Sequence, residues 1–416
     1  MFEKIGHLVV KRRKSVLALF IVALIAFGAM AGLAVPRLSG GGYTNPNSDS
    51  AKATEYLTST FHVQDPALVL EVKSTSLITD PAVAASAAAL EKSVAAEKGV
   101  AKTLSYWSAG GSPALASKDQ HAAFLFIYST ETDLYKTADL GKLIAAKYDG
   151  TFQGLRVYVN GIAAINSAIN EKITKDLAIA EGISVPLIFL LLLFVFGAFI
   201  ASATPLIVGV GAIIGSLGLI YLISLATGVS IFALNLITGM GLGLGIDYAL
   251  LMVNRFREEL HAGKEVEEAI VNTVKTAGKT VFYSGLTVFI TLASLTFFPM
   301  MFLKSFGYAG MSVVAMAVLV ALLPFPAILA MIGTGIDKFV VRKSAVTPKA
   351  DGRWAQTARL VMRRPVAVVV LSLIALTAIA APVRDIVFSQ AGAQVMPASS
   401  PIAIADRTVI EDFPGQ

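Results

Sequence analysis

The sequence predicts an α-helical membrane protein of about seven spans that carries an α+β domain outside the membrane. Of the 416 residues, 55% are hydrophobic and only 15% are charged, whereas soluble domains carry about 25% charged residues. The hydrophobic residues are concentrated in blocks of about 20, the length of a helix that crosses a bilayer. One stretch of soluble composition, residues 37–182, separates the first block from the others.

The spans are predicted from the length and hydrophobicity of these blocks. They cover residues 15–35, 183–203, 205–226, 229–253, 280–300, 307–332 and 366–382. The first block follows basic residues, as the core of a signal peptide would, but it is too long and ends in a poor cleavage site. We therefore expect residues 1–36 to remain as a basic N-terminus and a membrane anchor.

Basic residues in the loops predict the orientation, because Lys and Arg accumulate on the cytoplasmic side. Residues 1–14 hold five of them, and a loop at 335–365 holds eight. Six crossings separate the two segments, so both fall on the same side. We expect a multi-pass protein of the bacterial plasma membrane with a cytoplasmic N-terminus. The net charge of +6 then reflects topology, and no basic stripe with interleaved aromatic residues predicts nucleic-acid binding.

The domain at 37–182 is predicted to have the ferredoxin-like, split βαβ order of elements. Alternating and β-branched patterns indicate strands, and alanine-rich or amphipathic patterns indicate helices. The strands are expected at 67–73, 100–107, 122–128 and 155–160, and the helices at 81–97 and 134–148. A further helix at 162–181 would lead into the second span.

Nothing in this domain forms a catalytic or metal-binding group of residues. The chain has no cysteine, and its four histidines lie far apart, which argues against metal sites and cofactors. His62 beside Asp65 is expected to be a surface histidine in a turn. Tyr106 and Trp107 would either contact an apolar cargo or pack within a strand. We therefore predict that the protein is not an enzyme.

A partial internal repeat follows the loop at 335–365. The seventh span, residues 366–383, has basic residues before it and a proline after it, as the first span does, and residues 395–413 align with 45–61. Residues 384–416 would then begin a second extracytoplasmic domain. We expect a fragment of a protein about twice as long, or an interrupted frame. The alternative is a chance hydrophobic helix with a natural tail.

One charged residue, Asp247, lies inside the predicted spans, in the membrane domain at 183–334. A carboxylate at this depth costs about 2.5 to 3.5 kcal/mol on insertion scales, and such residues usually serve transport or proton relay. The alternative is an aspartate that only ties helices together through hydrogen bonds. Tyr248 follows it directly, and Ser284 and Thr287 in the next span are candidate hydrogen-bond partners, unless their hydroxyls bond to their own helix.

Glycines precede this aspartate at every second position and are expected to allow close helix packing. They are Gly239, Gly241, Gly243 and Gly245. The run is not a phosphate-binding loop, because no Lys-Ser/Thr pair follows it. It is not an intramembrane protease motif either, because the spans hold no second aspartate. An amphipathic segment at 254–279 is expected on the cytoplasmic side, either at the membrane interface or in solvent.

The strings GLGIDYALLMVNRFREEL at 243–260 and AGKTVFYSGLTV at 277–288 resemble the MmpL (mycobacterial membrane protein large) family of the resistance–nodulation–division superfamily. This resemblance implies an efflux transporter, driven by the proton-motive force, that exports lipids or other hydrophobic compounds. In that family an Asp-Tyr pair on the fourth span faces a second pair on the tenth, and together they carry protons. The match assigns the first pair to Asp247 and Tyr248.

The resemblance also implies partners and leaves alternatives open. Partners would be membrane lipids, a hydrophobic substrate, a missing second half or companion subunit, and further copies in an oligomer. One alternative is a membrane scaffold or sensor that does not transport. Another is a SecD/SecF-like half-subunit that aids protein export, although the Gly-Ile-Asp-Tyr motif and the seventh helix argue against it.

Overall fold

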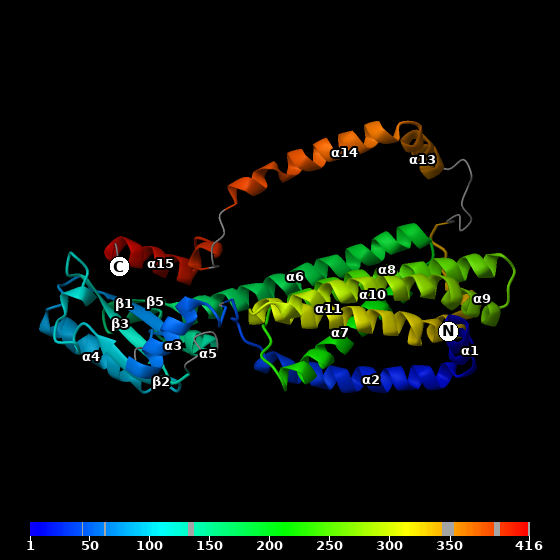
Figure 1. Cartoon of the computed structure of the whole chain (residues 1–416). Coiled ribbons are helices and arrows are strands. Elements are labelled where there is room, and N and C mark those ends of the chain that lie inside the picture. The colour runs from blue at the N-terminus through cyan, green and yellow to red at the C-terminus, as the bar shows by residue number, and fades with distance from the viewer. Residues whose placement is uncertain (44, 62–63, 132–136, 343–352, 387–391, 415–416) are drawn as a thin grey trace.

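The computed structural model describes residues 1–43, 45–61, 64–131, 137–342, 353–386 and 392–414. His62, the start of the helix expected at 134–148 and the middle of the loop at 335–365 lie outside these residues. Figure 1 shows a long helical bundle with an α+β domain at one end and the N-terminus at the other. We call the α+β part the sheet domain and the N-terminal side of the bundle its far end.

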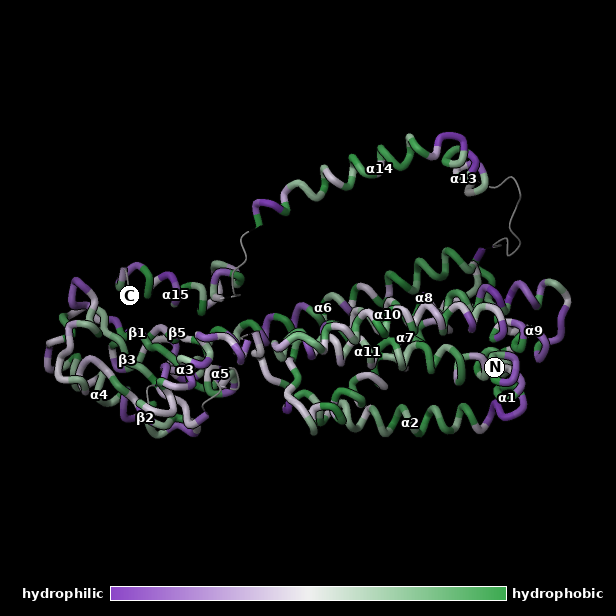
Figure 2. Tube along the Cα trace, viewed as in Figure 1, coloured by the Kyte–Doolittle hydropathy of each residue, from purple (hydrophilic) through white to green (hydrophobic). Residues whose placement is uncertain are grey.

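Seven helical segments in the described part of the chain are long and apolar enough to cross a membrane, as the sequence predicts. The two helices at the N-terminus are α1 (Phe2–Lys11) and α2 (Arg13–Ala34). The others in the bundle are α6 (Ile162–Phe196), α7 (Phe199–Ser224), α8 (Ala233–His261), α9 (Val266–Thr273), α10 (Lys279–Ala293), α11 (Met301–Leu322) and α12 (Pro324–Ile332). Figure 2 shows hydrophobic residues along most of this bundle.

Some helix ends differ from the predicted span ends because of glycine and proline. The expected second span at 183–203 stops at Phe196, because Gly197 takes a left-handed conformation (φ 71°) that ends α6. α7 begins before Pro205, which has no N–H to donate to the Ala201 carbonyl. The hydroxyl of Thr204 donates to that carbonyl instead, at 3.1 Å. Pro324 divides the sixth span into α11 and α12.

The segment expected at 254–279 belongs to longer helices. α8 runs on to His261, and α9 joins α10 through one π-helical turn at Val274–Gly278. The apolar stripe of α9 is buried and packs against α1, where a Cβ on Gly6 would lie 3.0 Å from the Cα of Val271. Lys275 pairs with Glu3 of α1 at 3.1 Å. The N-terminal helix therefore covers this stripe.

The sheet domain has the predicted strand order with one addition. The elements are β1 (Leu68–Lys73), α4 (Pro81–Ala95), β2 (Val100–Ser105), β3 (Ala122–Ser129), α5 (Ala138–Tyr148), β4 (Gly150–Phe152) and β5 (Leu155–Asn160). The antiparallel sheet has the order β2-β3-β1-β5-β4. The predicted ferredoxin-like class is thus confirmed. β4 is the added strand, and Gln153 and Gly154 (φ 46° and 84°) form its tight turn to β5.

Helices from both ends of the proposed repeat accompany the sheet domain. α3 (Asp49–Phe61) has no buried residue, whereas α15 (Pro401–Asp412) buries Ile402 and Ala405. Between the bundle and α15, α13 (Arg353–Arg363) leads into α14 (Pro365–Ala380), the predicted seventh span. Figure 1 shows α14 apart from the bundle, and none of its residues is buried.

Trp107 has a structural role in the sheet domain. Its indole Nε1 donates a hydrogen bond of 2.8 Å to the carbonyl of Ile78, and its ring packs against the core between the sheet and helices α4 and α5. Of the two roles expected for this residue, the structure supports packing, but from the turn after β2, because that strand ends at Ser105 and not at residue 107.

Candidate functional site

Two of the four glycines in α8 allow it to contact α7 closely. A Cβ on Gly245 would lie 2.5 Å from the Cα of Gly209, and a Cβ on Gly241 would lie 2.7 Å from a side-chain carbon of Ile213. Real Cβ atoms do not approach this closely, so only glycine permits the backbone contact at Gly245, whereas at Gly241 the side chain of Ile213 would have to move. For the other two glycines, Gly239 and Gly243, no atom of the described residues lies within 4 Å of such a Cβ.

The candidate proton-carrying residue lies on the same uncovered face as these other two glycines. Gly239, Gly243 and Asp247 are four residues apart in turn, which places them along one side of a helix. Asp247 is exposed, and in the described part of the chain no side chain hydrogen-bonds to its carboxylate. It lies about 12 Å along the helix from Arg255, at 1.5 Å per residue. The carboxylate is thus well inside the apolar part of α8 and away from its charged end.

Tyr248 points the other way, into the bundle. It is 4% exposed and packs within the core between α8, α10 and α11. Its hydroxyl would lie 3.5 Å from a Cβ on Gly285 and faces Ser284, but it makes no hydrogen bond of normal geometry to a described residue. Asp247 and Tyr248 therefore lie on different faces of the same helix.

The two hydroxyls named as candidate partners do not reach Asp247. Thr287 donates to the carbonyl of Tyr283 at 3.0 Å. This is the bond within its own helix that the sequence offered as the alternative to a bond with Asp247. Ser284 lies across from Tyr248. Among the described residues, the structure thus gathers Tyr248, Ser284 and Gly285 on one side and leaves Asp247 on the other.

An apolar groove lies near Tyr248, between α1, α10 and α11. It has a volume of about 400 Å³, and Gly285, which touches the Tyr248 side chain, lies in its lining. Its lining includes Phe2, Ile5, Phe282, Phe289, Val318 and Leu322. Such a groove fits a hydrocarbon chain and offers almost nothing to a polar group.

Two adjoining cavities of mixed character lie where the sheet domain meets the bundle. The larger, of about 790 Å³, is lined by residues 35–40 after α2 and by parts of α5 and α6. The smaller, of about 460 Å³, extends toward Met396 and Ile402. Lys142, Ser167, Glu171 and Lys175 line both. Charged and apolar side chains together suit a molecule with a polar head and an apolar tail.

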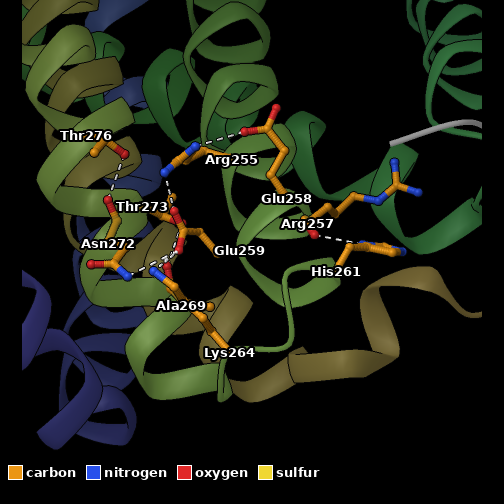
Figure 3. A network of polar contacts seen from close by, with 10 residues as sticks. All are labelled: Arg255, Arg257, Glu258, Glu259, His261, Lys264, Ala269, Asn272, Thr273 and Thr276. Carbon is orange, nitrogen blue, oxygen red and sulfur yellow. Dashed lines mark hydrogen bonds and ion pairs between the residues drawn. The ribbon is translucent and has the colours of Figure 1, made fainter. Parts of the chain in front are cut away.

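A polar network at the far end of the bundle was missed from the sequence (Figure 3). The carboxylate of Glu259 is nearly buried; it accepts from Lys264 at 2.7 Å and from Asn272 at 3.2 Å, and it also pairs with Arg255. Arg257, 6% exposed, donates to Asp337 at 2.7 Å. The network joins the end of α8 to α9 and to the segment after α12. The charged string NRFREEL was its only sequence signal.

The sequence also did not predict that Glu181 lies within a helix long enough to span the membrane. The expected second span began at residue 183, but α6 is one helix of 35 residues that contains Glu181. One of its carboxylate oxygens is buried, with no hydrogen-bond partner among the described residues.

Comparison with known proteins identifies the family. The MMPL family model matches residues 42–405. A membrane protein of Streptomyces coelicolor is 40% identical over 245 residues, which are 59% of this chain and 34% of that protein. The mycolic acid-containing lipids exporter MmpL11 of Mycolicibacterium smegmatis is 34% identical over 56% of this chain and 25% of its own. The trehalose monomycolate exporter MmpL3 of the same organism is 30% identical over 61% of this chain and 28% of its own.

The matched region therefore spans about a quarter to a third of the length of these relatives. The two M. smegmatis relatives are named as exporters of lipids and not as enzymes, which agrees with the transporter class predicted from the sequence. Since the family model covers most of the chain, this multi-pass membrane protein belongs to the MMPL family of the resistance–nodulation–division superfamily of transporters.

Proposed function

We propose that this chain forms one half of a proton-coupled exporter that moves lipids out of the cell. Mycolic-acid lipids are the substrate class in the names of its relatives, and family membership supports an export role. The location would be a bacterial plasma membrane, with the N-terminus in the cytoplasm. The basic residues of α1 and of the start of α2 support this orientation, because they lie at the far end of the bundle, away from the sheet domain (Figure 1).

The observation that carries the proposal is the uncovered carboxylate of Asp247 on an apolar helix. Left facing lipid, this group would cost about 2.5 to 3.5 kcal/mol. Gly239 and Gly243 on the same face leave room for a second helix to approach closely. A span from a second half or companion subunit therefore covers this face, and protonation of Asp247 changes how the two helices pack.

Tyr248 has a supporting role in this proposal. Its buried hydroxyl makes no hydrogen bond of normal geometry to a described residue, although it faces Ser284, and buried polar groups without partners are rare. A change in the position of α8 would move this hydroxyl relative to Ser284 and Gly285. Tyr248 thereby links the protonation state of its neighbour to the packing of α10.

The cavities at the junction of the two parts support a lipid cargo. Lys142, Lys175 and Glu171 offer charge and hydrogen bonds to a polar head group, and residues 35–40 place the larger cavity beside the end of α2. A lipid leaving the bilayer at this end would meet the cavity first. The adjoining smaller cavity continues the path along α5 and α6.

The test is gradient-driven uptake into inside-out membrane vesicles from cells that make the complete protein, with trehalose monomycolate as the probe. We expect Asp247→Asn to insert normally and to lose uptake at least tenfold, because an amide cannot exchange a proton in this way. Asp385→Asn, at an exposed position after α14, is the matched control and should keep uptake. Undiminished uptake by Asp247→Asn would refute the proton role, and lipid binding without gradient-driven uptake in the wild type would favour the scaffold.

A further inference from the structure

A charged residue is completely buried in the middle of the sheet domain. Glu71 lies on β1, directly between Phe124 on β3 and Tyr158 on β5, and it is 0% exposed. Its neighbours along the strand, Leu70 and Val72, belong to the core beneath α4 and α5. Because side chains alternate along a strand, Glu71 points to the opposite face.

The helix α15 covers that opposite face. Phe413, just after the helix, stacks on Phe124 with ring centroids 3.8 Å apart. Asp412 pairs with Lys73 of β1, and Asp406 accepts from the side chain of Asn160 at 3.4 Å. These contacts join a segment late in the chain to the first sheet domain and seal Glu71 from solvent.

The chemistry beneath α15 disfavours a negative charge on Glu71. Neither carboxylate oxygen has a hydrogen bond of normal geometry to a described residue. The titratable groups around it are Lys73 on its own strand, Asp119 before β3, Tyr158 on β5 and Asp412 on α15. Lys73 already pairs with Asp412, so the nearest cation among the described residues is shared between two acids.

Burial is the main reason that the pKa of Glu71 rises, and the carboxyl of Asp412 adds to it; together they raise the pKa to about 8. Lys73 acts in the opposite direction and does not offset them. At neutral pH Glu71 is therefore protonated while α15 is docked. A protonated carboxyl can share its proton with the Asp412 carboxylate, whereas two carboxylates would repel each other.

We propose that a proton on Glu71 holds α15 on the sheet, so that docking of this helix weakens as the pH rises. The docked helix joins the beginning of the second repeat to the first sheet domain. Loss of the proton would thus release a contact between two parts of the transporter on the side that carries the sheet domain. This proposal does not depend on the transport function.

The direction and size of the effect follow from linkage between proton binding and docking. With α15 released, Glu71 is in water and has its ordinary pKa of 4.5, against about 8 when the helix is docked. The contribution of Glu71 to docking is largest below pH 4.5, falls tenfold for each pH unit up to about 8, and is then constant. Across this range the docking constant falls by up to about three thousandfold through Glu71.

The chain has no cysteine, so two introduced cysteines can carry spin labels specifically. Ala101→Cys on β2 and Ile410→Cys on α15 are both at exposed positions, and the distance between them reports docking in the full chain in nanodiscs. From pH 5 to 9 we expect the short distance of the docked state to give way to a broad range of longer ones. A distribution that stays unchanged would overturn the proposal.

Two variants separate the role of this proton from a general effect of pH. Glu71→Gln cannot ionise and should remain docked at every pH, whereas Glu55→Gln, which removes an exposed acid from α3, should behave as the wild type. If Glu71→Gln loosens with pH as the wild type does, Glu71 is not the group responsible.

If Glu71→Gln does not fold, a second variant still tests the proposal. Asp412→Asn removes the competing acid and frees Lys73 for Glu71, so the release should move to lower pH than in the wild type. An unchanged midpoint would contradict the proposal.

In the wild type at pH 6, infrared spectra should also show the carbonyl band of a buried protonated carboxyl, and this band should weaken above pH 8.

Discussion

At the scale of single residues, glycines on one helix have different surroundings that the sequence could not distinguish. Gly239, Gly241, Gly243 and Gly245 recur at every second position, and spacing alone predicts close packing for all of them. The structure places Gly241 and Gly245 against α7 and leaves Gly239 and Gly243 uncovered. Which face of α8 meets a neighbour depends on contacts between helices, which a single-helix pattern does not contain.

Gly245→Ala should destabilise the bundle, because the new methyl group would lie 2.5 Å from the backbone of Gly209. Backbone atoms cannot rotate away, so α7 and α8 must separate, and we expect a loss of about 1 to 3 kcal/mol. Gly243→Ala is the matched control, because no atom of the residues that the structure describes lies within 4 Å of its new methyl group. Thermal unfolding of the purified chain in detergent measures both, and equal effects would contradict the packing described for α8.

The stability of the sheet domain should depend on pH partly through Glu97. The hydrogen bond from Lys147 and then that from Tyr148 lower the pKa of Glu97 below its ordinary 4.5. A lowered pKa stabilises the fold above pH 4.5, and this stabilisation is lost as the pH falls below that value. Unfolding of the sheet domain followed between pH 3 and 6 should therefore depend less on pH in Glu97→Gln. An identical slope in both proteins would show that these bonds contribute nothing.

At the scale of elements, the existence of helices and strands was more predictable than their ends and contacts. Hydrophobic length predicted the spans, because any helix in lipid needs about 20 apolar residues. The ends depended on local features such as the left-handed Gly197. The three-residue strand β4 is too short to produce an alternating pattern. The burial of α9 under α1 and of Glu71 under α15 could not be predicted, because the partners are hundreds of residues apart.

The uncovered face of α8 leads to a prediction at this scale. If a second helix packs there, Gly243→Ala should leave the stability of this chain unchanged and still reduce lipid export by the complete protein, because its methyl group would enter the contact. Export into inside-out vesicles measures this effect. The control is Gly182→Ala, because the described residues also leave open space around Gly182. Gly263 is not used, because its positive φ would strain an alanine. Full export by Gly243→Ala would argue against a partner on this face.

At the scale of the whole molecule, an apolar bundle and a sheet domain are distinct parts that the chain connects through the segment between α2 and α3 and through the long helix α6. α6 runs without a break from the last strand of the sheet domain to the far end of the bundle. A displacement within the membrane can therefore reach the lipid-sized cavities at the junction. Short motifs predicted the family, whereas the contacts inside the bundle and the sheet domain could not be predicted, because they join residues far apart in the sequence.

The central claim, that proton exchange at Asp247 drives export, is tested most directly by proton flux. Inside-out vesicles containing the complete protein are acidified inside, and trehalose monomycolate is added outside while a dye reports the internal pH. We predict that the lipid triggers proton efflux in the wild type and in Asp385→Asn, and none above background in Asp247→Asn. Lipid-triggered efflux of normal size in Asp247→Asn would contradict the claim.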